Sequence, residues 1–592
     1  MKIFCKTKCG SGTDPGDRAG FWLSYAAFLV IAGTVLLFCM ILAAALPAFF
    51  EPGPGSPFGW VWQPYQGSFG ILPMCLGSLA LASFALILGW PLSLFVCGFL
   101  LTEESPLLAP FRRAASVLVR WMTTIPTVVY GFAAVFLLTP LIRRAFGGSG
   151  MCLLAAGLIL TLEILPTMVL VMQAGLSPRL SRLCPWGQAL GFSRLGLFRL
   201  FVLPRSRRTL AAAAVLGFGR AAGDTLIPLM LAGNAVQVPQ GLLSSIRTLT
   251  AHMALVTSNE VGGAAYGSLF CAGLILLVVN AGASITLHAL EKEGGKGGVR
   301  GYQSSETVLR WILRGAVFLV FCAVSALILF LCAKGAGTLG PGLFFGDVPA
   351  LSAIFGQRAV WDGIWPACAG TACLVLLTML IATLPGVGCG IYLAAFCPPR
   401  RGRIFRTVLD VLAGTPSIVM GLFGFSFVLF LRNVAGINAN TSLLLSAACL
   451  ALLVLPVLVT STCQALEALP GELALTAAAL GFTRRQAVFR ILLPASFSGI
   501  QGGIILSLGR AAEDTAVIML TGVVANAGMP ALFGKFEALP FYVYYISAQY
   551  QDPGELSRGF GAAIVLLLLS TLLLTLAEML ERRFRRRWGK NA

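Results

Sequence analysis

The chain has 592 residues, of which 57% are hydrophobic and 11% are charged. Soluble domains carry about 25% charged residues, so this composition excludes an ordinary soluble protein and indicates an integral membrane protein. We attribute the formal net charge of +19 to cations that gather in cytoplasmic loops. Nucleic-acid binding is not expected, because no soluble basic domain is present.

Twelve apolar segments are long enough to cross a bilayer. Six lie near 21–46, 70–101, 115–141, 151–175, 209–233 and 266–290, and six near 312–333, 361–396, 407–431, 442–465, 499–525 and 559–580. If the N-terminus is inside, 31 of the 42 Lys and Arg fall in inside segments, so we expect both termini to be cytoplasmic. The first segment is too long for the core of a cleaved signal peptide and is expected to remain as a membrane helix.

The second half of the chain repeats the first at a constant offset of 290 residues. An even number of spans separates equivalent points, so the halves should share one orientation and be related by an axis along the membrane normal. We expect an all-α protein of two parallel six-helix repeats, 1–300 and 301–592, joined by a flexible linker at 291–302. The matched pairs are Pro126 and Pro416, Pro166 and Pro456, Gly191 and Gly481, and Pro204 and Pro494.

The 16 cysteines lie mostly in apolar segments, where a free thiol acts as a small apolar group. Cys5 and Cys9 could form half of a metal site. With only two histidines in the chain and no second cysteine pair at ligand spacing, we expect no metal.

One heptapeptide occurs in both halves, inside an apolar segment each time. It reads Gly-Arg-Ala-Ala-Gly-Asp-Thr at 219–225 and Gly-Arg-Ala-Ala-Glu-Asp-Thr at 509–515. An arginine and an aspartate four residues apart share one side of a helix. Charges within a membrane span usually face a protein interior or a water-filled path. We therefore expect an anion path lined by Arg220, Asp224, Thr225, Arg510, Glu513, Asp514 and Thr515, the alternative being that each pair only holds helices together.

Arginine suits this role because its planar fork can make two contacts with one oxyanion. The aspartate is expected to share the guanidinium when no anion is bound, which offsets desolvation and keeps the site weak enough to release its cargo. Of the other charges in the spans, Glu163 is expected to be either protonated or paired with one of the arginines. Arg120 and Asp410, at the starts of the third spans, are expected either to pair with each other or to be interfacial.

A second repeated device precedes the fifth span of each half, and we call these segments, 191–204 and 481–494, the elbows. Each has a glycine for a sharp turn, a short amphipathic stretch with arginines, and a Leu-Pro expected to end that stretch. An elbow is either an interfacial anchor or a docking element, and its repetition favours docking. The docking residues would be Gly191, Leu203, Pro204, Gly481, Leu493 and Pro494.

The elbows resemble the loops of ABC importer permeases, in which Glu-Ala-Ala, a glycine and Leu-Pro form coupling helices that enter the ATPase subunits. The family glutamate is replaced in this chain by Pro185 and Leu475. More narrowly, the halves resemble the phosphate-transport permease subunits PstC and PstA, through 124–131, 414–421, the heptapeptides, 245–252 and 538–545. In that family the heptapeptide region reads about Arg-Ala-x-Gly-Glu-Thr, so Asp224 and Asp514 replace its glutamate and Glu513 its glycine.

The resemblance implies a type I ABC importer permease that moves phosphate into the cytoplasm across a bacterial inner membrane. It also implies two copies of a PstB-like ATPase that use ATP and Mg, and a periplasmic or lipid-anchored PstS-like phosphate-binding protein. The chain has no Gly-x-x-x-x-Gly-Lys-Ser/Thr loop, so we expect a permease rather than an enzyme, with no cofactor of its own. The alternatives are a permease for sulfate or molybdate, and an ATP-independent anion carrier, which the elbows argue against.

Overall fold

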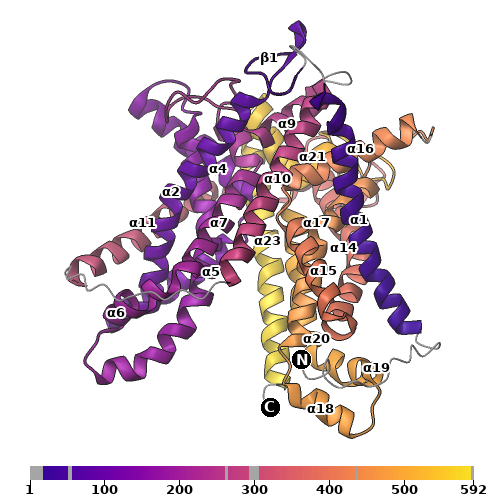
Figure 1. Ribbon diagram of the computed structural model, residues 1–592. Coiled ribbons are helices and arrows are strands. Elements are labelled where there is room, and N and C mark those ends of the chain that lie inside the picture. Colours follow the sequence, from indigo (N-terminus) through magenta and orange to yellow (C-terminus); the bar gives the residue numbers. More distant parts are fainter. Residues whose placement is uncertain (1–17, 51–55, 260–264, 293–305, 435, 589–592) are drawn as a thin grey trace. The chain divides into compact units, whose positions relative to one another are not determined.

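The computed structural model describes residues 18–50, 56–259, 265–292, 306–434 and 436–588, which form a helical protein (Figure 1). Within these residues, ten helices are long and apolar enough to cross a membrane, or eleven if a pair bent by 95° is one span. The Cys5–Cys9 pair and most of the linker lie outside the described residues.

Helices account for nearly all of the regular structure along the chain. The elements up to the start of the second half are α1 (Arg18–Phe49), β1 (Trp62–Gln63), η2 (Pro64–Gln66), β2 (Ser68–Phe69), α2 (Leu72–Thr102), η3 (Pro106–Leu108), α3 (Ala109–Met122), α4 (Thr127–Phe146), α5 (Leu153–Ala189), α6 (Arg194–Leu197), η4 (Phe198–Val202), η5 (Pro204–Ser206), α7 (Arg207–Gly223), α8 (Leu226–Leu231), α9 (Leu249–Asn259), α10 (Ala265–Lys292) and α11 (Glu306–Gly335). These are followed by η6 (Ala336–Thr338), α12 (Pro341–Phe345), α13 (Ala350–Ile354), α14 (Trp365–Ile391), η7 (Tyr392–Phe396), α15 (Pro399–Ala413), α16 (Ser417–Asn433), α17 (Leu443–Glu467), α18 (Gly471–Ala479), α19 (Arg484–Ala487), η8 (Val488–Leu492), α20 (Leu493–Glu513), α21 (Ala516–Thr521), α22 (Leu539–Gln549) and α23 (Pro553–Trp588). The strands β1 and β2 are antiparallel neighbours.

The chain forms two compact units whose limits differ from those of the sequence halves. The first unit comprises Ala45–Leu343 and Tyr542–Leu567, and the second comprises Met1–Ala44, Phe344–Phe541 and Leu568–Ala592. Most of α1 therefore belongs with the second half of the sequence, and α11 belongs with the first. The sequence repeat and the compact units are thus different divisions of the chain.

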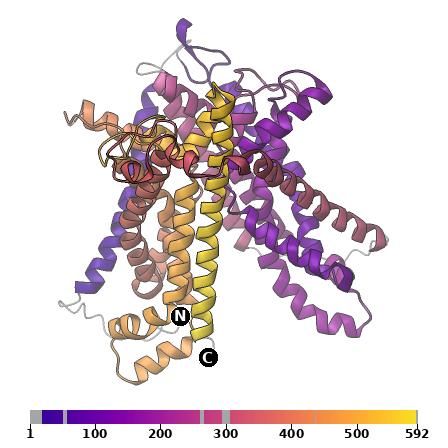
Figure 2. The ribbon, with the colours of Figure 1, turned by 180° about the vertical axis from the view of Figure 1, so that it is seen from behind.

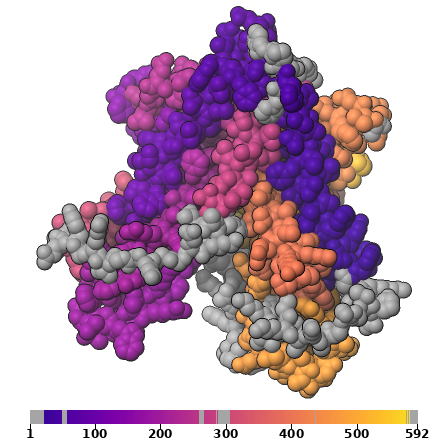
Figure 3. Space-filling model, viewed as in Figure 1, coloured from indigo at the N-terminus to yellow at the C-terminus, as the bar shows by residue number. Residues whose placement is uncertain are grey.

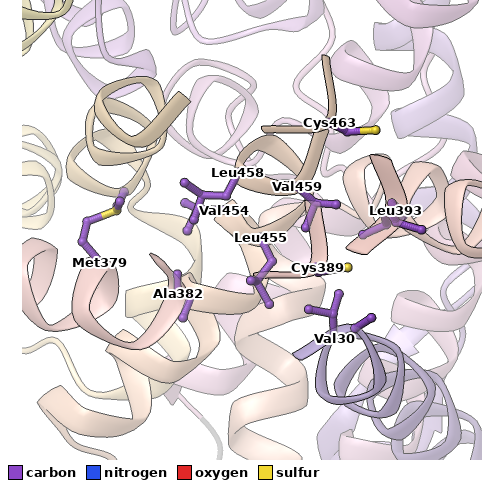
Figure 4. Packing of buried hydrophobic residues seen from close by; sticks show 14 of the residues in the cluster. Val30, Met379, Ala382, Cys389, Leu393, Val454, Leu455, Leu458, Val459 and Cys463 are labelled. Carbon is purple, nitrogen blue, oxygen red and sulfur yellow. The ribbon is translucent and has the colours of Figure 1, made fainter. Parts of the chain in front are cut away.

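The packing of α1 shows how the second unit is held together. Val30 of α1 joins a buried cluster with Cys389 of α14 and Val459 of α17 (Figure 4). A Cβ added to Gly33 would lie 3.1 Å from Leu452. Figures 1 and 3 show α1, in indigo, running alongside the orange helices of this unit. Lipid is as apolar as these side chains, so close packing through small residues is what favours association within this unit.

The third span of each half begins later than expected. A separate amphipathic helix, α3 or α15, precedes the apolar helix α4 or α16, and the bend between α15 and α16 is 95°. The break falls at Pro126 or Pro416, because proline disfavours helical backbone in the residue before it. Arg120 consequently lies on α3, outside the helices that are long and apolar enough to cross a membrane, and it is exposed and 3.4 Å from the Ser116 hydroxyl.

Candidate functional site

Each heptapeptide spans a break between two helices instead of lying within one. In the first unit α7 ends at Gly223 and α8 begins at Leu226; in the second, α20 ends at Glu513 and α21 begins at Ala516. Asp224 has an extended backbone, with φ −69° and ψ 138°, and Asp514 is similar. The expectation that arginine and aspartate share one helical face is therefore wrong, because the aspartate has left the helix.

The two aspartates cap the short helices that follow them. The backbone amide of Ile227 donates to Asp224 Oδ2 at 3.0 Å, and that of Val517 donates to Asp514 Oδ1 at 3.1 Å. The first amides of a helix have no partner inside the helix, so a carboxylate beside them stabilises the turn. The same contact stabilises the break in both units, so the break belongs to the repeated structure.

The threonines of the heptapeptides lie in the same breaks. Thr225 and Thr515 are both buried, and neither hydroxyl has a hydrogen-bond partner among the described residues. Asp224 is fixed from a further side, because the Thr250 hydroxyl donates to its backbone carbonyl at 2.8 Å.

Arg220 forms an ion pair with Glu163. Arg220 Nε donates to Glu163 Oε1 at 2.6 Å, and Nη1 donates to the Thr167 hydroxyl at 2.9 Å. The Glu163 side chain is 4% exposed and that of Arg220 is 43% exposed. Of the two alternatives for Glu163, pairing with an arginine is the one that the structure realises. Sequence reasoning did not anticipate Thr167, one helical turn further along α5.

The partners of Arg220 are not repeated in the second half of the sequence. The positions that match Glu163 and Thr167 at the 290-residue offset hold Leu453 and Val457. Leu453 is buried. The second unit has instead an extra carboxyl group on Glu513, the last residue of α20, where the first unit has Gly223. The side chain of Ser417 hydrogen-bonds to Asp514.

Each elbow begins at a glycine with left-handed backbone. Gly191 has φ +83° and Gly481 has φ +76°, and open space surrounds both, so the turn and not crowding requires glycine. The next helix is capped in both elbows: the Ser193 hydroxyl accepts from the Gly196 amide, and Thr483 forms a capping box. The expected glycine turn is confirmed.

The Leu-Pro pairs do not end the helical path as expected. In the first elbow η4 leads directly to Pro204, which opens η5 ahead of α7; in the second, Leu493 and Pro494 are the first residues of α20. Proline is tolerated in the first turn of a helix, because the amide it lacks would be unpaired there in any case. Pro494 therefore lies in the first turn of α20, and Pro204 lies three residues before α7. Each elbow lies at one end of its own unit in both ribbon views (Figures 1 and 2).

An ion pair and a hydrogen bond anchor the first elbow to the segment after α2 and to the start of α11. Arg194 pairs with Glu104 at 2.6 Å, and the Ser193 hydroxyl donates to Glu306 at 2.8 Å. Beside them, Arg314 donates twice to Glu103, at 3.0 and 3.1 Å. The charged groups of Glu103, Glu104, Arg194 and Arg314 border a cavity of about 270 Å³. Sequence reasoning missed these residues, because charges at a span boundary give no sign of their tertiary partners.

The Glu103 carboxylate has a shifted titration. Hydrogen bonds from Arg314 are the main reason that the pKa of Glu103 lies below its usual value. A group whose pKa is lower in the folded than in the unfolded state stabilises the fold at neutral pH. This contribution is lost as the pH falls through the folded-state pKa.

Charged residues at two helix breaks, two capped elbows and ten or eleven candidate spans among the described residues are those of a multi-pass membrane protein, and the family match shows that its class is a transport permease. The chain belongs to the family described as binding-protein-dependent transport system inner membrane component, whose model matches residues 95–293 and 386–586. One match falls in each half, and the two together cover most of the chain.

Three relatives illustrate the similarity. The chain is 30% identical over 275 residues to the probable ABC transporter permease protein YqgH of Bacillus subtilis (strain 168), covering 44% of this chain and 86% of the relative. It is 31% identical over 220 residues to the phosphate transport system permease protein PstA 1 of Mycobacterium tuberculosis (strain ATCC 25618 / H37Rv), covering 37% and 70%. It is 29% identical over 238 residues to PstC, the phosphate transport system permease protein of Haemophilus influenzae (strain ATCC 51907 / DSM 11121 / KW20 / Rd), covering 37% and 74%. Each relative thus aligns with less than half of this chain.

The Glu103–Arg314 pair provides a test of how the end of α2 is joined to α11 beside the first elbow. Glu103→Arg or Arg314→Glu alone should destabilise the purified chain by about 1.5–3 kcal/mol, the range for hydrogen bonds to charged groups, while the double reversal should recover most of the loss. Thermal unfolding in detergent measures this. Arg310→Gln, which removes an exposed pair, is the control and should change stability by less than about 1 kcal/mol. If the double variant loses as much stability as the two single variants together, the two residues do not act as a pair.

Proposed function

We propose that this chain is the permease of an ATP-driven phosphate importer, with a PstC-like half and a PstA-like half, 1–300 and 301–592, fused in one polypeptide. The observation that carries this proposal is the double family match, one in each half, together with relatives whose names are phosphate transport permeases of both the PstC and the PstA kind. No observation favours sulfate or molybdate, or a carrier that works without ATP.

In this proposal Arg220 and Arg510 attract the anion inside the membrane. Both side chains are exposed, and both lie near the end of a helix that breaks at the aspartate four residues later. Phosphate offers several acceptor oxygens to a guanidinium, and a neighbouring carboxylate limits the affinity so that the anion can leave. Asp224 and Asp514 keep the breaks open by capping α8 and α21, and Thr225, Thr515 and Glu513 complete the path.

The elbows would receive the partner that hydrolyses ATP. Leu190 and Leu480 stand next to the turn glycines and are 76% and 69% exposed, and large apolar side chains exposed at a tip favour a protein contact. We propose two copies of a PstB-like ATPase, which use ATP and Mg, one below each elbow. Leu203, Pro204, Leu493 and Pro494 would pass its movement into α7 and α20.

Outside the membrane, a PstS-like phosphate-binding protein, periplasmic or lipid-anchored, would deliver the anion. The excess of cations in the loops assigned to the inside supports a bacterial inner membrane location with both termini cytoplasmic. The elbows would then face the cytoplasm.

The path is tested by replacing its arginines. Arg220→Ala and Arg510→Ala should each lower uptake of radiolabelled phosphate by about tenfold or more, because a charge-assisted contact is worth about 1.5–3 kcal/mol. Insertion and yield should remain. Arg120→Ala is the control and should transport normally, since Arg120 is exposed on α3. Uptake at the wild-type rate in both path variants would exclude these residues from the path.

The coupling role is tested at the turn glycines. Gly191→Ala and Gly481→Ala place a Cβ on left-handed backbone, which costs about 1–2 kcal/mol and should distort the elbow. We expect less phosphate transported per ATP hydrolysed by the assembled complex. Gly471→Ala, in open space on α18 of the same region, should leave this ratio unchanged. If the turn variants couple as well as the control, the elbows are anchors only.

A further inference from the structure

Glu163 has a carboxylate oxygen that the ion pair with Arg220 does not use. Oε1 accepts from Arg220, whereas Oε2 is buried and has no hydrogen-bond partner among the described residues. An unsatisfied buried polar atom costs about 1–3 kcal/mol, and more when it is charged. Such an atom calls for an explanation, and one explanation is a partner that comes and goes.

The surroundings of Glu163 place this acceptor where an anion would bind. Arg220 is held along α5 by Glu163 and Thr167, yet 43% of its side chain is exposed. Because Arg220 Nε lies 2.6 Å from Glu163 Oε1, an anion that binds the guanidinium would lie next to the Glu163 carboxylate. A donor group on that anion could then be shared with the carboxylate.

A carboxylate in this position distinguishes oxyanions by whether they carry a proton. An ionised carboxylate can only accept hydrogen bonds. Hydrogen phosphate and dihydrogen phosphate each have an O–H that can donate to it, which makes a short, charge-assisted bond. Sulfate is fully ionised at neutral pH and has no O–H to donate. Its negative charge would be repelled by the carboxylate, with no hydrogen bond to compensate.

We propose that Glu163 is the specificity-determining residue of the first unit, selecting protonated oxyanions over fully ionised ones. The inference rests on the proposed function, in which Arg220 lines the phosphate path. Glu163 and Thr167 are not repeated in the other unit, where the matching positions hold Leu453 and Val457. One acceptor is sufficient, since each anion needs to be recognised once on its way through.

The test compares phosphate and sulfate binding to the full chain in lipid nanodiscs, without a binding protein that could impose its own selectivity. Isothermal titration with each anion gives the ratio of the two dissociation constants. The wild type should prefer phosphate by at least about tenfold, equivalent to about 1.4 kcal/mol. Glu163→Gln keeps the size of the side chain and an oxygen for Arg220, but its amide can donate to sulfate. The ratio of the sulfate to the phosphate dissociation constant should fall to nearly one in this variant, mainly because sulfate binds more tightly than it does to the wild type.

Two further variants separate the possible outcomes. Thr167→Val, which copies the second unit, removes a partner of Arg220 but keeps the acceptor, so it should weaken both anions and preserve the ratio. Arg220→Ala should abolish both. If Glu163→Gln keeps the wild-type preference while Arg220→Ala loses binding, the selectivity role is wrong and the path stands. If Arg220→Ala binds phosphate as well as the wild type, the path assignment itself fails, and equal binding of both anions to the wild type overturns the selectivity role.

Discussion

The ion pair between Arg220 and Glu163 is the interaction around which the first unit's site is built. A guanidinium within a membrane span needs a partner, and Glu163 supplies one at 2.6 Å from a position with almost no exposure of its own. The pairing fixes the end of α7 against α5, just before the chain leaves the helix at Asp224. The Arg220 guanidinium is therefore held just before a point where the backbone is irregular. Membrane proteins tolerate irregular backbone only where it is buried in protein or lines a cavity.

The same two helices connect the site to the elbow. α5 carries Glu163 in its middle and ends at Ala189, just before the elbow, while α7 follows the elbow and ends at Gly223. The 17 residues of α7 span about 25 Å, so in the proposed coupling a displacement of the elbow would be carried along one rigid element to Arg220. On its other side this elbow is held by the Arg194–Glu104 ion pair and by the hydrogen bond from Ser193 to Glu306 of α11. Although α11 comes from the second half of the sequence, it belongs to the same compact unit as this elbow.

Much of this could be predicted from the sequence. The apolar lengths indicated the spans, the constant offset revealed the repeat, and the glycine spacing located both turns, where Gly191 and Gly481 have the left-handed backbone. The helix breaks were missed, because Gly-Asp-Thr inside an apolar segment looks like a continuous span and the capping by Asp224 depends on backbone geometry. The choice of partner for Glu163 and the exchange of α1 and α11 between units depend on tertiary packing, which hydropathy and spacing do not report.

The central claim is that this chain is the membrane part of an ATP-driven phosphate importer. The most direct measurement is accumulation of radiolabelled phosphate in proteoliposomes that contain the full chain with its ATPase and its binding protein. Phosphate should accumulate on the side into which it is transported to a higher concentration than on the other side of the proteoliposome membrane. This should require ATP and Mg and all three protein components. Equilibration to equal concentrations without ATP, at the rate seen with it, would contradict the claim and identify the chain as a passive carrier.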